Sequence, residues 1–295
     1  MRIVVLGASG QIGSAIYDGL GSLHEVVGTS RQASGKYVRF DPIQEDWSAL
    51  GKVDVLINCI GQITASRQKS FHHIHVNLTK QILRHRLQIG NPFVIQLSAL
   101  GASTQHPVEF LRTKGIADDL LLQHGHAAVI RPSIVCTPGT MIVKKMFMLL
   151  KLGRLFFGVN PVPGGFLGTR IQPLMPEDLV ELILNICLTR RPGIIEAVGP
   201  QSINFRQLIQ ILEENINQKL RLIEVSRKVF DVMMKEVVSR LVPEILNWQQ
   251  YQLIFQDNIA DPFMIVRIIG RPLKSVLPFF RSELTYAVDR TDNTY

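Results

Sequence analysis

Residues 1–13 read M-R-I-V-V-L-G-A-S-G-Q-I-G, and this stretch decides the fold. Arg2 to Leu6 form a short run of branched apolar residues, which predicts a strand buried on both faces. Three glycines follow at a spacing of three residues, at Gly7, Gly10 and Gly13. Apolar residues then recur with the period of one helix face. The predicted order is strand, glycine turn and helix.

Each glycine has a physical reason in such a turn. Gly7 permits the tight bend, Gly10 lets the backbone approach a diphosphate, and Gly13 lets the helix pack close to the strand. The free N–H groups at the helix start favour phosphate, and the Ser9 hydroxyl can add a donor. A plain strand-to-helix turn is the alternative. We predict a dinucleotide-binding turn made of Gly7, Ser9, Gly10, Gln11, Ile12 and Gly13.

Length and composition bound the class of protein. The chain has 295 residues, of which 46% are hydrophobic, enough for a large core and a smaller lobe. It has no apolar run long enough to span a membrane. The first strand begins at residue 2, so we expect no signal peptide or presequence and a cytoplasmic location. The net charge of +8 favours anionic partners, but no nucleic-acid motif accompanies it, so we expect no nucleic-acid binding.

The second predicted strand, His24 to Ser30, ends where a dinucleotide-binding fold meets the adenosine ribose. An acidic residue at this tip would favour NAD(H). This chain has Ser30 and Arg31 instead, which suit a 2′-phosphate, so we expect NADP(H) in preference to NAD(H). An exposed loop arginine is the alternative interpretation.

Two further positions follow predicted strands. Asp41 comes after a strand at residues 36–40, where it can cap the next helix; a contact with the adenine is the alternative that the family resemblance described below implies. Gly61 ends a buried strand at residues 53–60, and its small size would let a cofactor lie close.

A basic stretch at residues 69–88 is predicted to be helical and contains His72, His73 and His75. His72 and His75 share a helix face, but no carboxylate or cysteine lies nearby in sequence, so we expect no metal site. The three cysteines are far apart, without metal or redox spacing.

Several motifs in order carry a family resemblance. They are L-S-A-L-G-A (97–102), F-L-R-T-K (110–114), V-I-R-P-S-I-V (129–135), F-G-V-N-P-V-P-G-G (157–165), R-I-Q-P-L-M-P-E-D-L-V (170–180) and L-I-F-Q-D-N-I-A-D-P (253–262). The chain resembles the atypical, extended short-chain dehydrogenases/reductases of the NAD-dependent epimerase/dehydratase-like kind. Within these it resembles the group of the NADPH-binding accessory subunit of respiratory complex I.

The resemblance implies site residues and raises a question about catalysis. Working members use Y-x-x-x-K, in which the tyrosine transfers a proton and the lysine holds the nicotinamide ribose. This chain has Phe110 in the tyrosine position and keeps Lys114. Ser98 lies near the family's catalytic Ser or Thr, and Pro132 resembles the proline behind the nicotinamide. Lys114 and Ser98 are therefore the candidate catalytic residues.

We expect a doubly wound parallel α/β sheet, with a dinucleotide-binding domain at residues 1–139. Residues 140–295 should form mainly a small C-terminal α/β lobe, with returns to the sheet near Gln172 and Ile194. The apolar, basic segment 144–159 either covers the substrate or docks to a membrane or protein complex. Two functions stay open: an oxidoreductase or epimerase acting on an unidentified small molecule, and a non-catalytic NADPH-binding structural, regulatory or assembly protein.

Overall fold

The computed structural model describes residues 1–32, 35–61, 70–140, 142–143, 158–238 and 248–283. Its strands are β1 (Arg2–Leu6), β2 (Glu25–Ser30), β3 (Val38–Arg39), β4 (Val55–Asn58), β5 (Phe93–Leu97), β6 (Ala127–Pro132), β7 (Val159–Pro163), β8 (Arg170–Ile171), β9 (Gly193–Ala197), β10 (Ile203–Asn204) and β11 (Arg221–Val225). Its α-helices are α1 (Gln11–Gly21), α2 (Leu78–His85), α3 (Glu109–Leu122), α5 (Pro176–Thr189), α6 (Phe205–Ile216), α7 (Arg227–Met233), α9 (Trp248–Leu253) and α10 (Phe263–Ile269). Short 3-10 turns cover Trp47–Leu50, Arg86–Ile89 and Phe166–Gly168, and π-helical segments cover His73–Asn77 and Met234–Val238.

Within the described residues, seven strands form one sheet in the order β3-β2-β1-β4-β5-β6-β9. Every pair in this sheet is parallel, as the near-continuous apolar runs of the strands indicate. Leu6 is level with Thr29 on one side and with Asn58 on the other. The carboxyl ends of β1, β2 and β4 therefore meet at one edge of the sheet. The doubly wound parallel α/β fold is confirmed.

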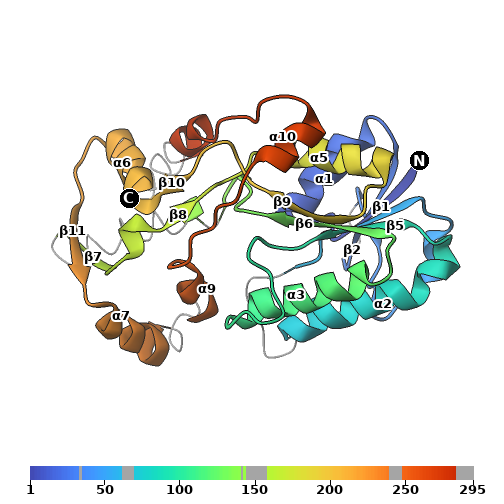
Figure 1. The fold of residues 1–295 in the computed structure, drawn as a ribbon, viewed down its shortest axis with the longest axis horizontal. Coiled ribbons are helices and arrows are strands. Elements are labelled where there is room, and N and C mark those ends of the chain that lie inside the picture. Colours follow the sequence, from blue (N-terminus) through green and yellow to red (C-terminus); the bar gives the residue numbers. More distant parts are fainter. Residues whose placement is uncertain (33–34, 62–69, 141, 144–157, 239–247, 284–295) are drawn as a thin grey trace.

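Helices cover both faces of the sheet (Figure 1), with α1, α5 and α10 on one side and α2 and α3 on the other. Side chains alternate along β1 to serve both layers. Ile3 and Val5 belong to the core with α1 and α5, whereas Val4 and Leu6 belong to the core with α2 and α3. Two helix layers thus bury the apolar residues on both sheet faces.

The C-terminal lobe consists of β7, β8, β10, α6, β11 and α7, and lies beside the sheet in Figure 1. It has its own apolar core, in which Val162, Phe205 and Leu208 pack with Val276 and Phe280. β9 returns to the large sheet beside β6, while β8 pairs with β10 in the lobe. Gln172 follows β8, and nearby Leu174 forms an isolated bridge with Val135.

One strand of the lobe lies where the composition is typical of a loop. Residues 161–165 read P-V-P-G-G, yet Val159–Pro163 is a strand, β7, parallel to β11. A proline is tolerated there because the two-stranded sheet leaves alternate backbone groups outside its ladder. Most of segment 144–159, predicted to cover the substrate or to dock, lies outside the described residues.

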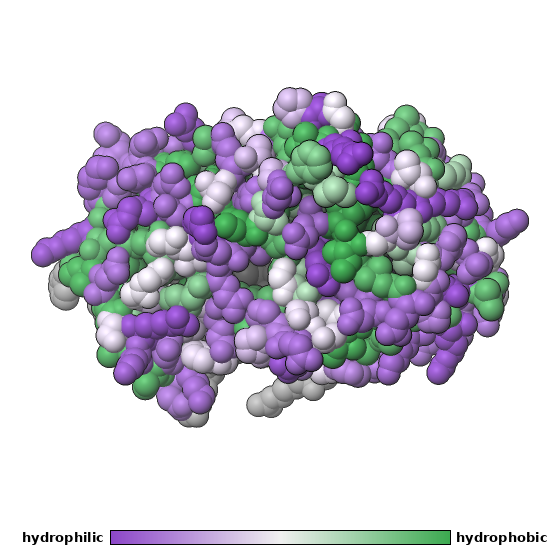
Figure 2. All heavy atoms as spheres, viewed as in Figure 1, coloured by the Kyte–Doolittle hydropathy of each residue, from purple (hydrophilic) through white to green (hydrophobic). Residues whose placement is uncertain are grey.

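The visible surface in Figure 2 is mostly polar, with apolar side chains interspersed and gathered over α10. In that helix Phe263 and Val266 are exposed. Among the described helices, none combines the length and the apolar character that crossing a membrane requires.

Candidate functional site

The glycine turn after β1 is shaped by close backbone packing. Gly7 has a φ of +75°, a conformation that favours glycine. A Cβ atom at Gly13 would lie 2.2 Å from the Gly7 carbonyl oxygen, so α1 can approach the turn only with glycine there. At Gly10 a Cβ atom would meet the same oxygen at 3.4 Å, an ordinary contact. Gly13 is therefore needed for packing, whereas Gly10 leaves space outside the turn.

The first backbone N–H groups of α1 have no side-chain cap. Gly10 is its N-cap, without a capping side chain, and its first turn holds no acidic residue. The Gln11 side chain donates to the Pro138 carbonyl oxygen at 3.2 Å, away from these N–H groups. Unsatisfied N–H groups and the positive end of the helix dipole are what an anion requires.

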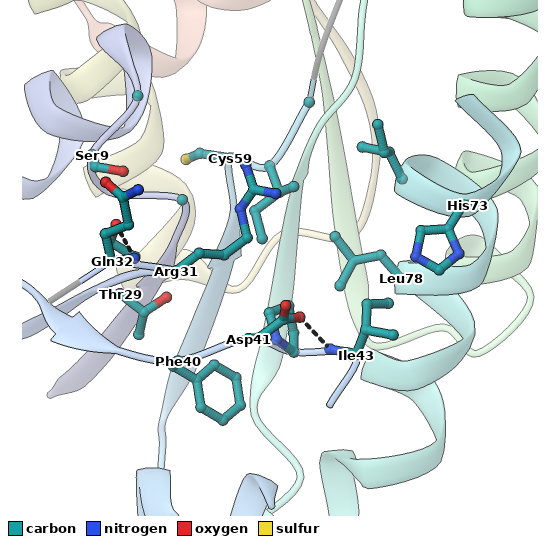
Figure 3. A pocket seen from close by; sticks show the side chains of 17 residues that line it. Ser9, Thr29, Arg31, Gln32, Phe40, Asp41, Ile43, Cys59, His73 and Leu78 are labelled. Carbon is teal, nitrogen blue, oxygen red and sulfur yellow. Dashed lines mark hydrogen bonds between the residues drawn. The ribbon is translucent and has the colours of Figure 1, made fainter. Parts of the chain in front are cut away.

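A pocket of about 570 Å³ opens at this end of the sheet. Figure 3 shows the side chains around it. The pocket gathers seven of the predicted cofactor residues: Gly7, Ser9, Gly10, Ser30, Arg31, Asp41 and Gly61. Further lining residues that the sequence analysis did not assign to the cofactor are Thr29, Gln32, Phe40, Pro42, Ile43, Cys59, Ile60, His73, Ile74 and Leu78.

Arg31 dominates the charge of the pocket. Its exposed side chain extends over the pocket in Figure 3, next to the end of β2. The Ser30 hydroxyl oxygen accepts from the Gln32 N–H at 3.3 Å, which fixes the turn after β2. Among the residues that the structure describes, no carboxylate pairs with Arg31, so its charge is available to an anion.

Asp41 lies beside Arg31, because the Phe40 N–H donates to the Ser30 carbonyl oxygen at 2.9 Å, and it forms a turn. Its Oδ1 accepts from the Ile43 N–H at 3.0 Å. Of the two alternatives for Asp41, the helix cap is not found: no helix follows it directly, and the 3-10 turn Trp47–Leu50 that comes next is capped by Asp46. The Asp41 side chain therefore stays beside the pocket.

The remaining predicted residues lie outside the pocket lining. Gln11, Ile12 and Gly13 belong to α1, and Pro132 is buried at the end of β6, where its carbonyl accepts from the Leu100 N–H at 2.9 Å. No local sequence pattern separates these positions from those that reach the pocket.

Lys114 is buried immediately behind Gly61. Its Nζ donates to the Leu97 carbonyl oxygen at 2.9 Å and lies 3.4 Å from where a Gly61 Cβ would stand. Burial lowers the pKa of Lys114 to about 8, although Asp118 and Cys59 oppose this shift. Gly61 lines the pocket, so among the described residues the ammonium group lies at van der Waals distance from a Cβ position at the pocket edge.

Ser98 is occupied in a buried charge cluster. Its hydroxyl donates to Asp118 Oδ2 at 2.8 Å, and Arg131 Nε donates to the same oxygen at 3.0 Å. Asp118 is fully buried, and this burial raises its pKa even though both partners favour the carboxylate. The Ser98 proton is thus directed at Asp118, and Ser98 does not line the pocket.

His72 and His75, which were predicted to share a helix face, differ in their exposure to solvent. His75 is buried, and its Nδ1 lies 2.8 Å from Thr113 Oγ1, whereas His72 is exposed. Within the described ranges, no three His, Cys, Asp or Glu side chains are placed to hold a metal ion. Of the cysteines, Cys136 and Cys187 are buried and Cys59 is half-buried at the pocket.

No family model matches the chain. In sequence it is 27% identical over 242 residues to NADH dehydrogenase (ubiquinone) 1 alpha subcomplex subunit 9, mitochondrial, of Arabidopsis thaliana. The match covers 76% of this chain and 58% of that subunit, so the chain corresponds to little more than half of its relative. The chain is thus similar in sequence to this NADH dehydrogenase subunit.

Solved structures share the fold of this chain. A nucleoside-diphosphate-sugar epimerase from Staphylococcus aureus matches with a TM-score of 0.70 and 15% identity, over 95% of this chain and 100% of that chain. MoeE5, in complex with UDP-glucose and NAD, matches with a TM-score of 0.73 and 14% identity, over 99% of this chain and 100% of that chain. RMD from Pseudomonas aeruginosa, complexed with NADPH, matches with a TM-score of 0.66 and 14% identity, over 97% of this chain and 99% of that chain. The fold that the resemblance to epimerase/dehydratase-type short-chain reductases implies is confirmed.

Phe110 is buried in an apolar cluster. It packs with Phe71, Val108 and Leu111, and Leu253 of α9 contacts the same cluster. The Phe110 ring also meets the His75 ring edge to face at 5.6 Å between centroids. Neighbouring aromatic rings and a leucine from the C-terminal half therefore enclose the position at which the resemblance predicts the tyrosine of Y-x-x-x-K.

Proposed function

We propose that this chain binds a nicotinamide adenine dinucleotide with its diphosphate on the glycine turn after β1. The observation that carries the proposal is the bare start of α1, opening into a pocket of about 570 Å³. The space outside Gly10 and the absence of an acidic residue in the first helix turn fit a diphosphate. Solved structures of the same fold contain NAD or NADPH, which supports the proposal.

The preferred cofactor in this proposal is NADP(H). Ser30 and Arg31 lie at the end of β2, where the adenosine ribose is expected, and Arg31 has no carboxylate partner among the described residues. A guanidinium group binds a phosphate through paired N–H donors, so a 2′-phosphate would add affinity there.

The catalytic part of the proposal is restricted by the side chains near Phe110. A bound nicotinamide supplies hydride chemistry, and the protein must supply the proton. In this proposal Lys114 contacts the ribose past Gly61, but Phe110 has no hydroxyl and Ser98 donates to Asp118. We therefore propose a dinucleotide-binding protein with weak or absent oxidoreductase or epimerase turnover on a small molecule.

A second candidate function is structural: a dinucleotide-stabilised subunit or assembly protein of a respiratory complex. The homologous plant protein is named as a subunit of NADH dehydrogenase, which favours this candidate. The apolar enclosure of Phe110 also fits a protein in which the dinucleotide is not turned over.

Binding is tested with two glycine variants. Gly10→Ala places a methyl group where the diphosphate would lie, while its φ of −77° suits alanine, so the fold should persist. We expect at least a tenfold loss of NADPH affinity by calorimetry on ligand-stripped protein. Gly21→Ala is the control, because a Cβ atom there meets nothing within 4 Å. Equal affinity in Gly10→Ala and the control would contradict the proposed diphosphate site.

Turnover is tested by restoring the hydroxyl. Phe110→Tyr should create NADPH-dependent reduction of quinone, aldehyde or sugar-nucleotide substrates if the rest of the site is preserved, and Lys114→Met should abolish it in the double variant. If the wild type reduced these substrates at a rate comparable to that of Phe110→Tyr, and Lys114→Met abolished this activity, the proposal that the wild type lacks a proton donor would be contradicted.

A further inference from the structure

The end of β5 is held from α3 by two residues that lie one helix turn apart. Lys114 Nζ donates to the Leu97 carbonyl oxygen at 2.9 Å, and Asp118 Oδ2 accepts from the Ser98 hydroxyl at 2.8 Å. Residues four positions apart share a helix face, so the ammonium group and the carboxylate face the same strand end. Both side chains are buried. Two opposite charges are therefore kept from water at this place.

A third charge belongs to the same buried set. Arg131 Nε, near the end of β6, donates to Asp118 Oδ2 at 3.0 Å. Asp118 Oδ1 is also buried, and it has no hydrogen-bond partner among the described residues. One carboxylate thus serves two cations, which leaves positive charge in excess. The excess lies toward the pocket, because Lys114 Nζ is 3.4 Å from a Cβ position at Gly61, which lines the pocket.

Other titratable groups near Lys114 do not balance its charge. Within the part of the chain that the structure describes, these groups are Cys59 after β4 and His75 in the π-helical segment. Burial raises the pKa of the Cys59 thiol to about 12 and lowers the pKa of His75 to about 3, so both are neutral at neutral pH. Asp118 is therefore the described group that opposes the cost of burying the ammonium group.

We propose that Asp118 is a positioning residue, which keeps Lys114 a cation beside Gly61 and thereby fixes the pH range in which the pocket binds a dinucleotide. This rests on the proposed dinucleotide binding. The ammonium group has further N–H donors besides the one used on Leu97, and a ribose hydroxyl or a phosphate accepts from such donors. A neutral amine attracts no anion, so affinity should fall as the pH rises and Lys114 loses its proton.

The two partners in the buried ion pair should act in opposite directions. Asp118→Asn removes the negative charge but keeps an oxygen for Ser98 and Arg131, so Lys114 should lose its proton at a pH roughly one unit lower. Arg131→Gln removes the competing positive charge and keeps an N–H donor, so Lys114 should hold its proton to a pH roughly one unit higher. A merely structural role would disturb the site in the same way in both variants.

Calorimetry with NADPH on the full chain, from about pH 7 to about pH 9.5, measures the effect on binding. Wild type should bind roughly tenfold more weakly at the upper end, because a charge-assisted hydrogen bond is lost. Lys114→Met should bind with one affinity across the range. The pH at which the fall begins should be lower in Asp118→Asn and higher in Arg131→Gln. Asp119→Asn is the matched control, because Asp119 is the exposed neighbour on α3.

A second measurement needs no ligand. In the ligand-free chain, an NMR titration of the lysine ε carbons follows proton loss from Lys114, whose signal is assigned by its disappearance in Lys114→Met. The wild-type midpoint should lie near pH 8, because burial lowers the pKa of Lys114 to about 8. Asp118→Asn and Arg131→Gln should displace this midpoint in opposite directions.

The outcomes separate the two proposals. If wild type binds no NADPH at any pH, the proposed function fails and pH-dependent binding fails with it, while the NMR titration still decides the charge role of Asp118. If NADPH binds with the same affinity across the pH range, or if both charge variants move the midpoint in the same direction, only this inference is overturned. Should Asp118→Asn fail to fold, Arg131→Gln decides alone, because only a charge role predicts a higher midpoint.

Discussion

At the scale of single residues, two titratable side chains near α3 are held away from water. Lys114 is 5% exposed and His75 is 2% exposed. Burial disfavours the charged form of both, which lowers both pKa values. Each residue therefore links folding to pH, and the two links act in different pH windows.

Lys114→Met should raise the stability of the ligand-free protein. The folded pKa of about 8 lies below the ordinary value of 10.5, so between these values the unfolded chain binds more protons and stability rises with pH. Below pH 8 the charged lysine costs stability, and its removal should add up to about 3 kcal/mol at pH 7. Urea unfolding at pH 7 and 10 measures both effects. A variant less stable than wild type at pH 7, with an unchanged pH profile, would show that Lys114 is not desolvated.

His75→Asn should reduce acid sensitivity. Burial and the neighbouring Lys114 charge lower the pKa of His75 from 6.5 to about 3. In that window the unfolded chain takes up a proton that the folded chain excludes, so stability falls by about 1.4 kcal/mol per pH unit as the pH decreases. Asparagine cannot titrate but can still donate to Thr113. Denaturant unfolding from pH 6.5 to 4.5 should give a flatter profile than wild type, whereas exposed His124→Asn should leave it unchanged.

At the scale of elements, α3 is the helix that arranges this region. It carries Phe110, Thr113, Lys114 and Asp118, whose contacts extend to β5, β6 and the π-helical segment His73–Asn77. The helix can lie this close to the preceding loop because of one glycine: a Cβ atom at Gly115 would stand 2.4 Å from the Ser103 carbonyl carbon.

Gly115→Ala should destabilise the fold, although alanine is the better helix former. The added methyl group must displace backbone of the 103–104 loop, and overpacking of this kind costs about 1–3 kcal/mol. Gly21→Ala in α1 meets no such obstacle and should be neutral or slightly stabilising. Chemical denaturation of both variants measures the difference; equal stabilities would mean that the loop yields without cost.

At the scale of the whole molecule, residues 256–260 connect the sheet with the C-terminal lobe. The Asn258 N–H donates to Arg170 O at 2.8 Å, and the Gln172 N–H donates to Asn258 O at 3.0 Å. On the sheet side, the Ser133 hydroxyl donates to Asn258 Oδ1. Since Ser133 follows β6 and Arg170 belongs to β8, this segment links the two parts of the molecule at one residue.

A double-mutant cycle should detect this link. Ser133→Ala and Asn258→Ala each remove one side of a contact between residues 125 positions apart. We expect each to cost about 1 kcal/mol of unfolding free energy, and the double variant to cost less than their sum, because they share one hydrogen bond. Strict additivity would mean that the contact does not couple the lobe to the sheet.

The sequence by itself determined the parallel sheet and the glycine turn. Apolar runs, helix periods and the spacing of Gly7, Gly10 and Gly13 are local patterns, and strand and helix formation follow from them. The tip of β2 could also be located, because in this fold the end of the second strand has a defined relation to the first.

Only the tertiary structure decided which side chains share the pocket and which are used elsewhere. It brought His73 opposite Arg31, directed the Ser98 hydroxyl to Asp118, and inserted Asn258 between the sheet and the lobe. The physical reason is that each of these arrangements depends on a partner distant in sequence. A hydroxyl or imidazole takes its role from the group that it meets, and no neighbouring residue in the chain specifies that group.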